Sequence, residues 1–321
     1  MELEPLVVSD RAQIAAATAL WNAACGAELA ISERAMAYNT APVAGVVQAG
    51  MVAMAEGRPA GFVLASFMPD DPSVSPPDAG WLDAVAVHPD FQRRGIGSAL
   101  LAWAEGWLRD HGCRRVRLGG SIHPFAAGLP VQLGTEAFFA RRGYAAAPGH
   151  ERAWDVAHDL AHYVTPPSAR KATGLHGRPA RPGEEDALLG FLRREFPGRW
   201  RFEAECHLAE GGRISDYVLL WSERGVEGFC QLTFEDSVRP LDRFFPYGLP
   251  RPWGQLGSVG VSWDRHGQGY GAVLMDAALR HMRDLGIRGC VIDWTSIVGF
   301  YAKFGFKPFR EYWMMGKTLE A

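Results

Sequence analysis

The feature that most constrains this chain is an internal repeat, because a duplicated sequence block predicts a duplicated structural unit. Residues 81–118 (WLDAVAVHPDFQRRGIGSALLAWAEGWLRDHGCRRVRL) align without a gap to residues 255–292 (QLGSVGVSWDRHGQGYGAVLMDAALRHMRDLGIRGCVI), 174 positions further on. Twelve of the 33 positions from 82 to 114 are identical, against roughly two for sequences of ordinary composition. A second pair, FFARRGY (138–144) and FYAKFGF (300–306), is offset by 162, so the first copy holds 12 additional residues between its blocks. A period of roughly 170 residues is too long for a solenoid and predicts two copies of one domain.

A length of 321 residues also suits two domains, each long enough to bury its own core. The segment TPPSARKATGLHGRPARPG (165–183) is rich in Pro, Gly and basic residues and has no apolar periodicity, which is typical of a linker. We therefore expect a first domain at 1–168, a linker at 169–183 and a second domain at 184–321.

Composition limits the functional classes. A formal charge of −3 gives no electrostatic basis for binding nucleic acid or anionic membranes. The five cysteines are scattered and never form a CxxC pair, so we expect a reducing compartment, no zinc knuckle and no disulfide framework. No signal peptide or long apolar run is evident, which favours the cytoplasm. No Ser-His-Asp, HExxH or Cys-His arrangement supports a hydrolase or a metalloenzyme.

Each repeat block has the order strand, glycine loop, helix, strand. The apolar runs WLDAVAV and LGSVGV suit strands, and the helices that follow end at Gly112 and Gly286. Hairpin patterns precede both blocks. Each domain is therefore expected to be α+β, with an antiparallel sheet leading into a βαβ unit.

The glycine loops QRRGIG (92–97) and HGQGYG (266–271) each lie between a strand and a helix N-terminus. Such a position offers unpaired N–H groups and the positive end of a helix dipole, which together favour phosphate. The spacing is neither GxGxxG, because residue 100 is Leu, nor a P-loop, because no Lys-Ser/Thr follows. One such loop is weak evidence, but two in the same structural context indicate a phosphate-bearing ligand.

These loops, each after a V-x-V strand, resemble the coenzyme A pyrophosphate loop of the GCN5-related N-acetyltransferases. FYAKFGF (300–306) resembles the distal helix motif of that family. The resemblance covers the cores of both halves. It implies two tandem acyl-CoA N-acyltransferase domains of α/β three-layer type, each with a mixed, mostly antiparallel sheet flanked by helices. It further implies acetyl-CoA as cosubstrate, no metal, and direct attack by a primary amine of a small molecule.

The resemblance also implies which residues hold coenzyme A. Backbone N–H groups of the strand before the loop would polarise the thioester carbonyl, and the loop would hold the pyrophosphate. In the first domain these residues are Val85, Val87, Gln92, Arg93, Arg94, Gly95, Gly97 and Ser98. In the second they are Val259, Val261, His266, Gly267, Gln268, Gly269, Gly271 and Ala272.

The candidate catalytic residues differ between the two copies. Tyr301 stands where the family often places an acidic tyrosine that protonates the leaving thiolate, whereas the first copy has Phe139 there. Asp83 lies two residues from Val85 and is expected on the same strand face. We therefore favour the C-terminal copy as catalytic, with the N-terminal copy binding coenzyme A only. Asp293 is the candidate base.

Other interpretations stay open from the sequence. The base could instead come from Glu235 and Asp236 or from a water chain, and Tyr301 could be a buried core tyrosine. The chain could also be a non-catalytic sensor that binds coenzyme A, or a structural protein that has kept only the fold. The acceptor amine is not specified, because fold does not define substrate. We expect no nucleic-acid or membrane partner, and a monomer or a homodimer.

Overall fold

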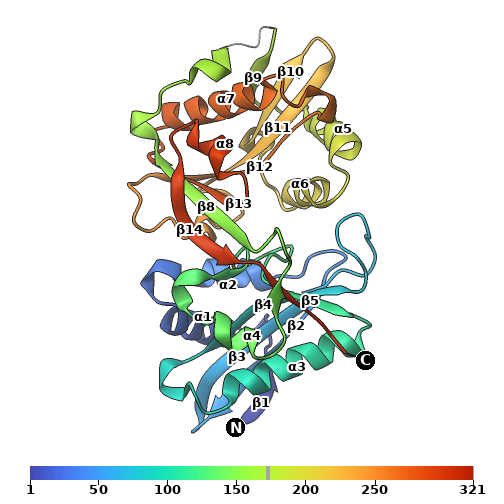
Figure 1. The fold of residues 1–321 in the computed structure, drawn as a ribbon, viewed down its shortest axis with the longest axis vertical. Coiled ribbons are helices and arrows are strands. Elements are labelled where there is room, and N and C mark those ends of the chain that lie inside the picture. Colours follow the sequence, from blue (N-terminus) through green and yellow to red (C-terminus); the bar gives the residue numbers. More distant parts are fainter. Residues whose placement is uncertain (171–173, 321) are drawn as a thin grey trace. The chain divides into compact units, whose positions relative to one another are not determined.

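The computed structural model describes residues 1–170 and 174–320, which form two compact units (Figure 1). The first unit contains Met1–Ala153 together with Arg310–Ala321, and we call it the N-terminal lobe. The second unit contains Trp154–Phe309, and we call it the C-terminal lobe.

The N-terminal lobe is built on a sheet with the strand order β1-β2-β3-β4-β5-β15-β7. Its neighbouring strands are antiparallel except for β4 and β5, which are parallel. The strands are β1 (Glu2–Pro5), β2 (Val47–Ala55), β3 (Arg58–Phe67), β4 (Ala79–Val87), β5 (Arg115–Leu118), β7 (Ala145–Ala146) and β15 (Met315–Thr318). The short strand β6 (Leu129–Pro130) pairs with Tyr312 and Trp313. The helices are α1 (Arg11–Cys25), α2 (Glu33–Thr40), α3 (Ile96–Asp110) and α4 (Glu136–Ala140).

Helices cover both faces of this sheet because its strands are apolar on both sides. Val63 and Ala65 of β3 pack in the same cluster as the buried residues of α3. Phe62 and Leu64 point to the opposite face by strand alternation and are equally buried, on the side where α1 contacts β3 and β4. The lobe is therefore a three-layer α/β structure.

The C-terminal lobe repeats this architecture, with the strand order β14-β8-β13-β12-β11-β10-β9. Here β12 and β13 are the parallel pair. The strands are β8 (Arg152–Asp159), β9 (His176–Pro179), β10 (Tyr217–Ser222), β11 (Gly225–Phe234), β12 (Trp253–Val261), β13 (Gly289–Thr295) and β14 (Lys307–Trp313). The helices are α5 (Glu185–Glu195), α6 (Arg199–Ala209), α7 (Tyr270–Asp284) and α8 (Val298–Ala302). Cys230 and Leu232 of β11 pack with α7, and Phe229 packs with α5 and α6 on the other face.

The lobes exchange their last strands. Strand β8, which follows the N-terminal repeat in sequence, pairs with β13 of the C-terminal lobe. Strand β15, at the end of the chain, lies between β5 and β7 of the N-terminal lobe, and in Figure 1 the red C-terminal segment ends beside α3. The compact units therefore depart from the expected domains 1–168 and 184–321. Strand β8 belongs to the C-terminal lobe and strand β15 to the N-terminal lobe, because their sheet hydrogen bonds lie there.

The expected linker at 169–183 contains a strand. His176 to Pro179 form β9, which pairs with β10 at the edge of the C-terminal sheet. Gly177 serves close packing, since a Cβ atom there would collide with the Cβ of Ala277 in α7. Part of the expected linker is therefore an edge strand that packs against α7. Residues 171–173 of that linker lie outside the described residues.

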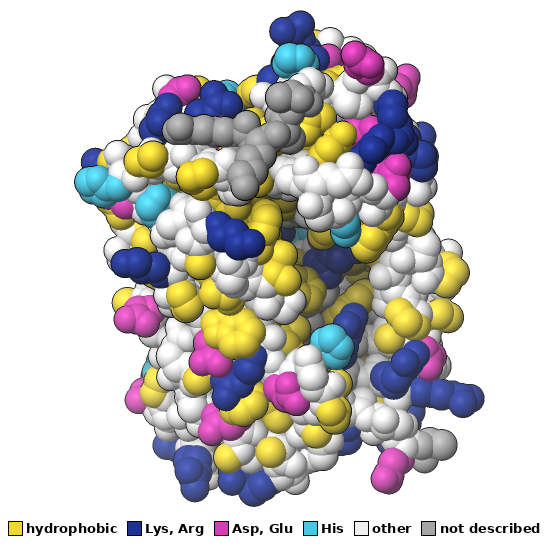
Figure 2. Space-filling model, turned by 45° about the horizontal axis from the view of Figure 1, so that its top comes forward, with side chains coloured by type: hydrophobic (Ala, Val, Ile, Leu, Met, Phe, Trp, Pro, Cys, Tyr) yellow, Lys and Arg dark blue, Asp and Glu magenta, His cyan; other side chains and the backbone are white. Residues whose placement is uncertain are grey.

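The face of the molecule in Figure 2 shows no strong separation of charge. Figure 2 shows acidic, basic and apolar side chains interspersed on the face that it displays, as the formal charge of −3 leads one to expect. No helix in the described part of the chain combines the length and apolar composition needed to cross a membrane.

Candidate functional site

In each lobe the pairing between two parallel strands stops part-way along the first of them. In the N-terminal lobe, β4 pairs with β5 only as far as Leu82, although β4 continues to Val87. In the C-terminal lobe, β12 pairs with β13 only as far as Gln255 and continues to Val261. Beyond these points, one side of β4 and of β12 faces a split in the sheet.

The backbone N–H groups of Val85 and Val87 point into the split of the N-terminal lobe. The N–H of His88 donates to the carbonyl of Ala60 on β3 at 2.9 Å. Because hydrogen-bonding direction alternates along a strand, Ala86 also faces β3, and its two neighbours face the open side. The carbonyl of Val87 on this side accepts a hydrogen bond from the amide of Gln92 at 3.1 Å.

The C-terminal lobe has the same backbone orientation near its loop. The N–H of Ser262 donates to the carbonyl of Glu227 at 2.9 Å, so Val261 faces the split. Val259 lies beside a register shift between β11 and β12, where Ser258 has a positive φ of 49°.

The two glycine loops share one backbone conformation. Gly95 and Gly269, the N-cap residues of α3 and α7, have φ values of 84° and 87°. Arg93 and its counterpart Gly267 are also left-handed, at 63° and 77°. Neither N-cap contributes a side-chain hydrogen bond, and neither helix has an acidic residue in its first turn in this described region. The orphan N–H groups of both helices are therefore available to an anion.

The N-terminal loop has more cationic side chains near it. Arg93, Arg141 and Arg142 line the cavity beside this loop. The guanidinium of Arg142 donates to the carbonyl of Phe138 at 2.8 Å and to the hydroxyl of Ser98, and it lies 3.8 Å from the Phe138 ring centre. These contacts fix one positive charge at the start of α3.

Arg94 points elsewhere. Its guanidinium pairs with Glu56 at 2.7 Å and does not contribute to the cavity lining. In the C-terminal lobe, Arg265 lies 3.7 Å from the buried carboxylate of Glu227. The repeat alignment places Lys303 and Phe304 at the positions of the two cavity arginines that follow α4. The C-terminal loop therefore has less positive charge around it.

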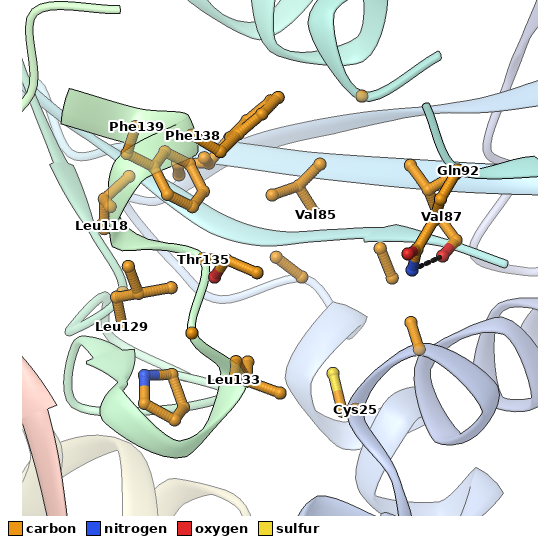
Figure 3. A pocket seen from close by; sticks show the side chains of 18 of the residues that line it. Cys25, Val85, Val87, Gln92, Leu118, Leu129, Leu133, Thr135, Phe138 and Phe139 are labelled. Atoms are coloured by element: carbon orange, nitrogen blue, oxygen red, sulfur yellow. Dashed lines mark hydrogen bonds between the residues drawn. The ribbon is translucent and has the colours of Figure 1, made fainter. Parts of the chain in front are cut away.

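A cavity of about 700 Å³ occupies the split of the N-terminal lobe (Figure 3). One wall is β4 from Leu82 to Val87, and another is the glycine loop, including Gly95, Gly97 and Ser98. Trp21 and Cys25 contribute from α1. Figure 3 shows Gln92 and Val87 at one end and Leu118 and Leu129 at the other, with Val85 between them. Orphan N–H groups, cations and this volume together fit a coenzyme A pyrophosphate and its pantetheine arm.

Asp83 does not share a strand face with Val85, contrary to expectation. A β-bulge lies at Asp83, because Leu82 pairs with Ala65 whereas Ala84 pairs with Leu64. The extra residue breaks the alternation of side chains. As a result, Leu82 and Val85 both pack in the cluster around α3.

The carboxylate of Asp83 is buried, and its hydrogen-bond donors include Ser66 and Gln48. The hydroxyl of Ser66 donates at 2.8 Å and the amide of Gln48 at 2.9 Å. Burial raises the pKa of Asp83 to about 6, because desolvation outweighs these hydrogen bonds. Asp83 also borders the cavity.

In the C-terminal lobe a carboxylate reaches the split from the opposite strand. The hydroxyl of Thr233 donates to the amide oxygen of Gln255 at 2.8 Å, and the Gln255 amide donates to Asp293 on β13 at 2.6 Å. Gly257, the counterpart of Asp83, leaves room for this chain, since a Cβ atom there would collide with the Gln255 amide. Asp293 is half-buried.

Tyr301 is delivered by α8 to the core of the same lobe and is 7% exposed. Burial raises the pKa of Tyr301 well above its ordinary value, and the nearby charge of Asp293 raises it further. The phenol therefore stays protonated at neutral pH. Phe139 occupies the equivalent position in the N-terminal lobe and lines its cavity.

Several cavity residues were not predicted from the sequence. Arg141 and Arg142 were visible in the block FFARRGY (138–144), where two consecutive cations follow a short helix. Leu129 and Thr135 belong to the additional residues of the first copy, for which the second copy offers no counterpart.

Comparison with known proteins identifies the class. The sequence profile of the Acetyltransferase (GNAT) family matches residues 17–144 and 186–306, one match in each lobe. The chain belongs to this family, with two tandem domains, and is an N-acetyltransferase.

Among particular relatives, the chain is 30% identical to a mycothiol acetyltransferase of Kineococcus radiotolerans over 259 residues, which is 76% of this chain and 75% of the relative. It is 27% identical to a mycothiol acetyltransferase of Actinosynnema mirum over 268 residues, 82% of this chain and 81% of the relative.

Two solved structures share the fold. A tandem GNAT protein from the clavulanic acid biosynthesis pathway has a TM-score of 0.72 at 17% identity, covering 100% of this chain and 99% of that one. The glucosamine N-acetyltransferase region of a fungal multi-domain β-N-acetylglucosaminidase has a TM-score of 0.85 at 22% identity. That match covers 98% of this chain and 38% of the fungal protein.

Proposed function

We propose that this protein transfers the acetyl group of acetyl-CoA to a primary amine of a small molecule, with the chemistry in the C-terminal lobe. The observation that carries this proposal is Tyr301, a buried phenol of the C-terminal core whose pKa is raised by burial and by the charge of Asp293. The N-terminal lobe has Phe139 at that position, and a phenyl ring has no proton to donate.

Bound acetyl-CoA supplies a thioester, whose carbonyl needs hydrogen-bond donors and whose sulfur needs a proton when it leaves. The N–H of Val261 faces the split and is assigned, with that of Val259, to the carbonyl oxygen. The hydroxyl of Tyr301 donates a proton to the sulfur. Asp293, oriented by Gln255, takes the proton of the attacking amine.

The glycine loops hold the pyrophosphate in this proposal. Gly269 and Gly271 open the N-terminus of α7 in the C-terminal lobe, with His266, Gly267, Gln268 and Ala272 around them. In the N-terminal lobe, Arg93 and Arg142 add charge to the same backbone arrangement, which fits a site that binds coenzyme A without turnover. Asp83 has no assigned proton-transfer role, because both of its carboxylate oxygens already accept hydrogen bonds.

Because relatives are named mycothiol acetyltransferases, we would test an amine related to mycothiol first. The assay is release of the coenzyme A thiol from acetyl-CoA with a panel of amines, comparing wild type, Tyr301→Phe and Phe139→Leu. Loss of a proton donor predicts a fall in kcat of about 10²-fold or more for Tyr301→Phe, with little change in KM for acetyl-CoA. Phe139→Leu is a matched change in the other lobe.

A kcat that survives in Tyr301→Phe but collapses in Asp83→Asn would move the chemistry to the N-terminal lobe. Absence of thiol release with every amine would favour a protein that binds coenzyme A without catalysis.

A further inference from the structure

The N-terminal cavity has an apolar inner end, formed by the side chains of Leu118, Leu129 and Phe139, and Leu133 lines the cavity between this end and Cys25. Figure 3 shows Leu118, Leu129 and Phe139 on the side of Val85 that is opposite Gln92. Leu118, Leu129 and Phe139 are buried in the same core cluster that supports α3. A ligand that enters by the glycine loop and passes Val85 therefore meets hydrocarbon beyond it.

Two independent differences from the C-terminal lobe create this inner end. The additional residues of the first copy supply Leu129, and β6 holds Leu129 by pairing it with Trp313. The second difference is Phe139, which replaces the hydroxyl-bearing Tyr301. Both differences make the inner end of the N-terminal cavity, where the acyl group of a bound thioester would lie, less polar than the equivalent region of the C-terminal lobe.

The polar groups nearby are poorly placed to bind an amine at this end. The carboxylate of Asp83 is taken up by Ser66 and Gln48. Thr135 contributes a single hydroxyl to the lining beside Leu133. A protonated amine at the inner end would lose its hydration and find no free carboxylate to replace it, which costs free energy. A hydrocarbon chain carries no charge and would not have this cost.

We propose that the N-terminal lobe binds coenzyme A thioesters whose acyl chain is longer than acetyl, with the chain against Leu118, Leu129 and Phe139. The proposal rests on the part of the proposed function in which this lobe binds coenzyme A. It extends that part by naming the class of ligand, a short to medium-chain acyl-CoA.

The test is calorimetric titration of the whole protein with free CoA, acetyl-CoA, butanoyl-CoA and hexanoyl-CoA, without an amine. Gly97→Asp and Gly271→Asp place a carboxylate at the phosphate end of one lobe each. The added Cβ atoms would be 3.5 Å from the Phe138 ring and 3.6 Å from the Phe300 ring, which are ordinary contact distances in both lobes. Butanoyl-CoA should bind roughly tenfold more tightly than acetyl-CoA, through two further buried methylene groups. Gly97→Asp should abolish this gain and Gly271→Asp should retain it.

A second variant tests the inner end directly. Leu129→Asn should reduce the gain for butanoyl-CoA while leaving the Kd of free CoA unchanged, and the latter shows that the lobe is folded. Equal affinity for acetyl-CoA and butanoyl-CoA at the site sensitive to Gly97→Asp would overturn the proposal of a longer acyl chain. It would leave the binding of coenzyme A by this lobe in place. A gain that is lost in Gly271→Asp instead would also overturn it. Free CoA binding that is insensitive to Gly97→Asp would overturn the assignment of coenzyme A to this lobe.

Discussion

Replacing Arg93 with glycine separates the backbone conformation of the N-terminal loop from its charge. Arg93 has a φ of 63°, and Gly267 holds the same conformation in the other lobe without a side chain. The left-handed region costs a non-glycine residue about 1–2 kcal/mol. Glycine in turn adds about 0.5–1 kcal/mol of backbone entropy to the unfolded chain. Arg93→Gly should therefore raise the free energy of unfolding by roughly 0–1.5 kcal/mol.

The same change should weaken binding of coenzyme A. Arg93 is exposed and borders the cavity, so its interaction with a phosphate is largely screened by water. A unit charge at contact distance in water is worth about 1 kcal/mol, which predicts a two- to fivefold rise in Kd at the N-terminal site. The reciprocal variant, Gly267→Arg, should destabilise the C-terminal lobe by a similar amount and tighten its binding.

Urea unfolding measures the first effect and calorimetric titration with free CoA at low salt measures the second. A loss of more than about 1 kcal/mol in Arg93→Gly would refute the reasoning from backbone strain. An unchanged Kd would show that the Arg93 charge does not meet the phosphates.

Three further predictions concern Asp83, Gln255 and the C-terminal strand β15. Burial raises the pKa of Asp83 from 3.8 to about 6, so the folded protein binds a proton at this carboxyl more readily than the unfolded chain does. The free energy of unfolding should therefore rise as the pH falls from 7 toward 4. Asp83→Asn should flatten this dependence, and urea unfolding at pH 5 and 8 would measure it; an identical slope would contradict the assignment. Gln255→Leu removes the hydrogen bond that orients Asp293, so kcat should fall roughly tenfold while KM for acetyl-CoA stays unchanged. An unchanged kcat in the thiol-release assay would exclude Asp293 from the mechanism. Deleting residues 315–321 should unfold the N-terminal lobe, since Met315 and Leu319 are buried in its core and Lys317 pairs with Glu105 at 2.8 Å. Hydrogen exchange would show that loss of protection, and protection that persists would contradict it.

The sequence predicted what depends on local patterns. The repeat predicted two equivalent domains, and the order of strand, glycine loop and helix is confirmed in both lobes. The family resemblance is confirmed as well. The loop conformation could be anticipated from Gly95 and Gly269, because both positions need a left-handed backbone.

What could not be predicted depends on contacts between distant segments. The bulge at Asp83 is a property of the pairing between β3 and β4, and strand alternation alone places the side chain on the wrong face. The chain of hydrogen bonds from Thr233 through Gln255 to Asp293 joins three strands. The assignment of catalytic roles to Tyr301 and Asp293 stays a prediction.

Exchange of the last strands was equally invisible, because β8 and β15 have ordinary strand patterns that would suit either sheet. Local propensity decides that a strand forms and does not decide which edge it joins.

Because of the exchanged strands, the first sheet cannot be completed until the second half of the chain has been made. The N-terminal sheet has a gap between β5 and β7 until β15, which follows the whole C-terminal repeat in sequence, reaches it. At about 5–20 residues per second, roughly 10–30 s pass between synthesis of Ala153 and synthesis of that strand. The first half therefore waits incomplete while the second is made, with the β5 edge available to wrong partners. A chain terminated early cannot finish its first sheet. A gene that loses either half also leaves a sheet open in the other, so the duplicated halves have to be inherited as one unit.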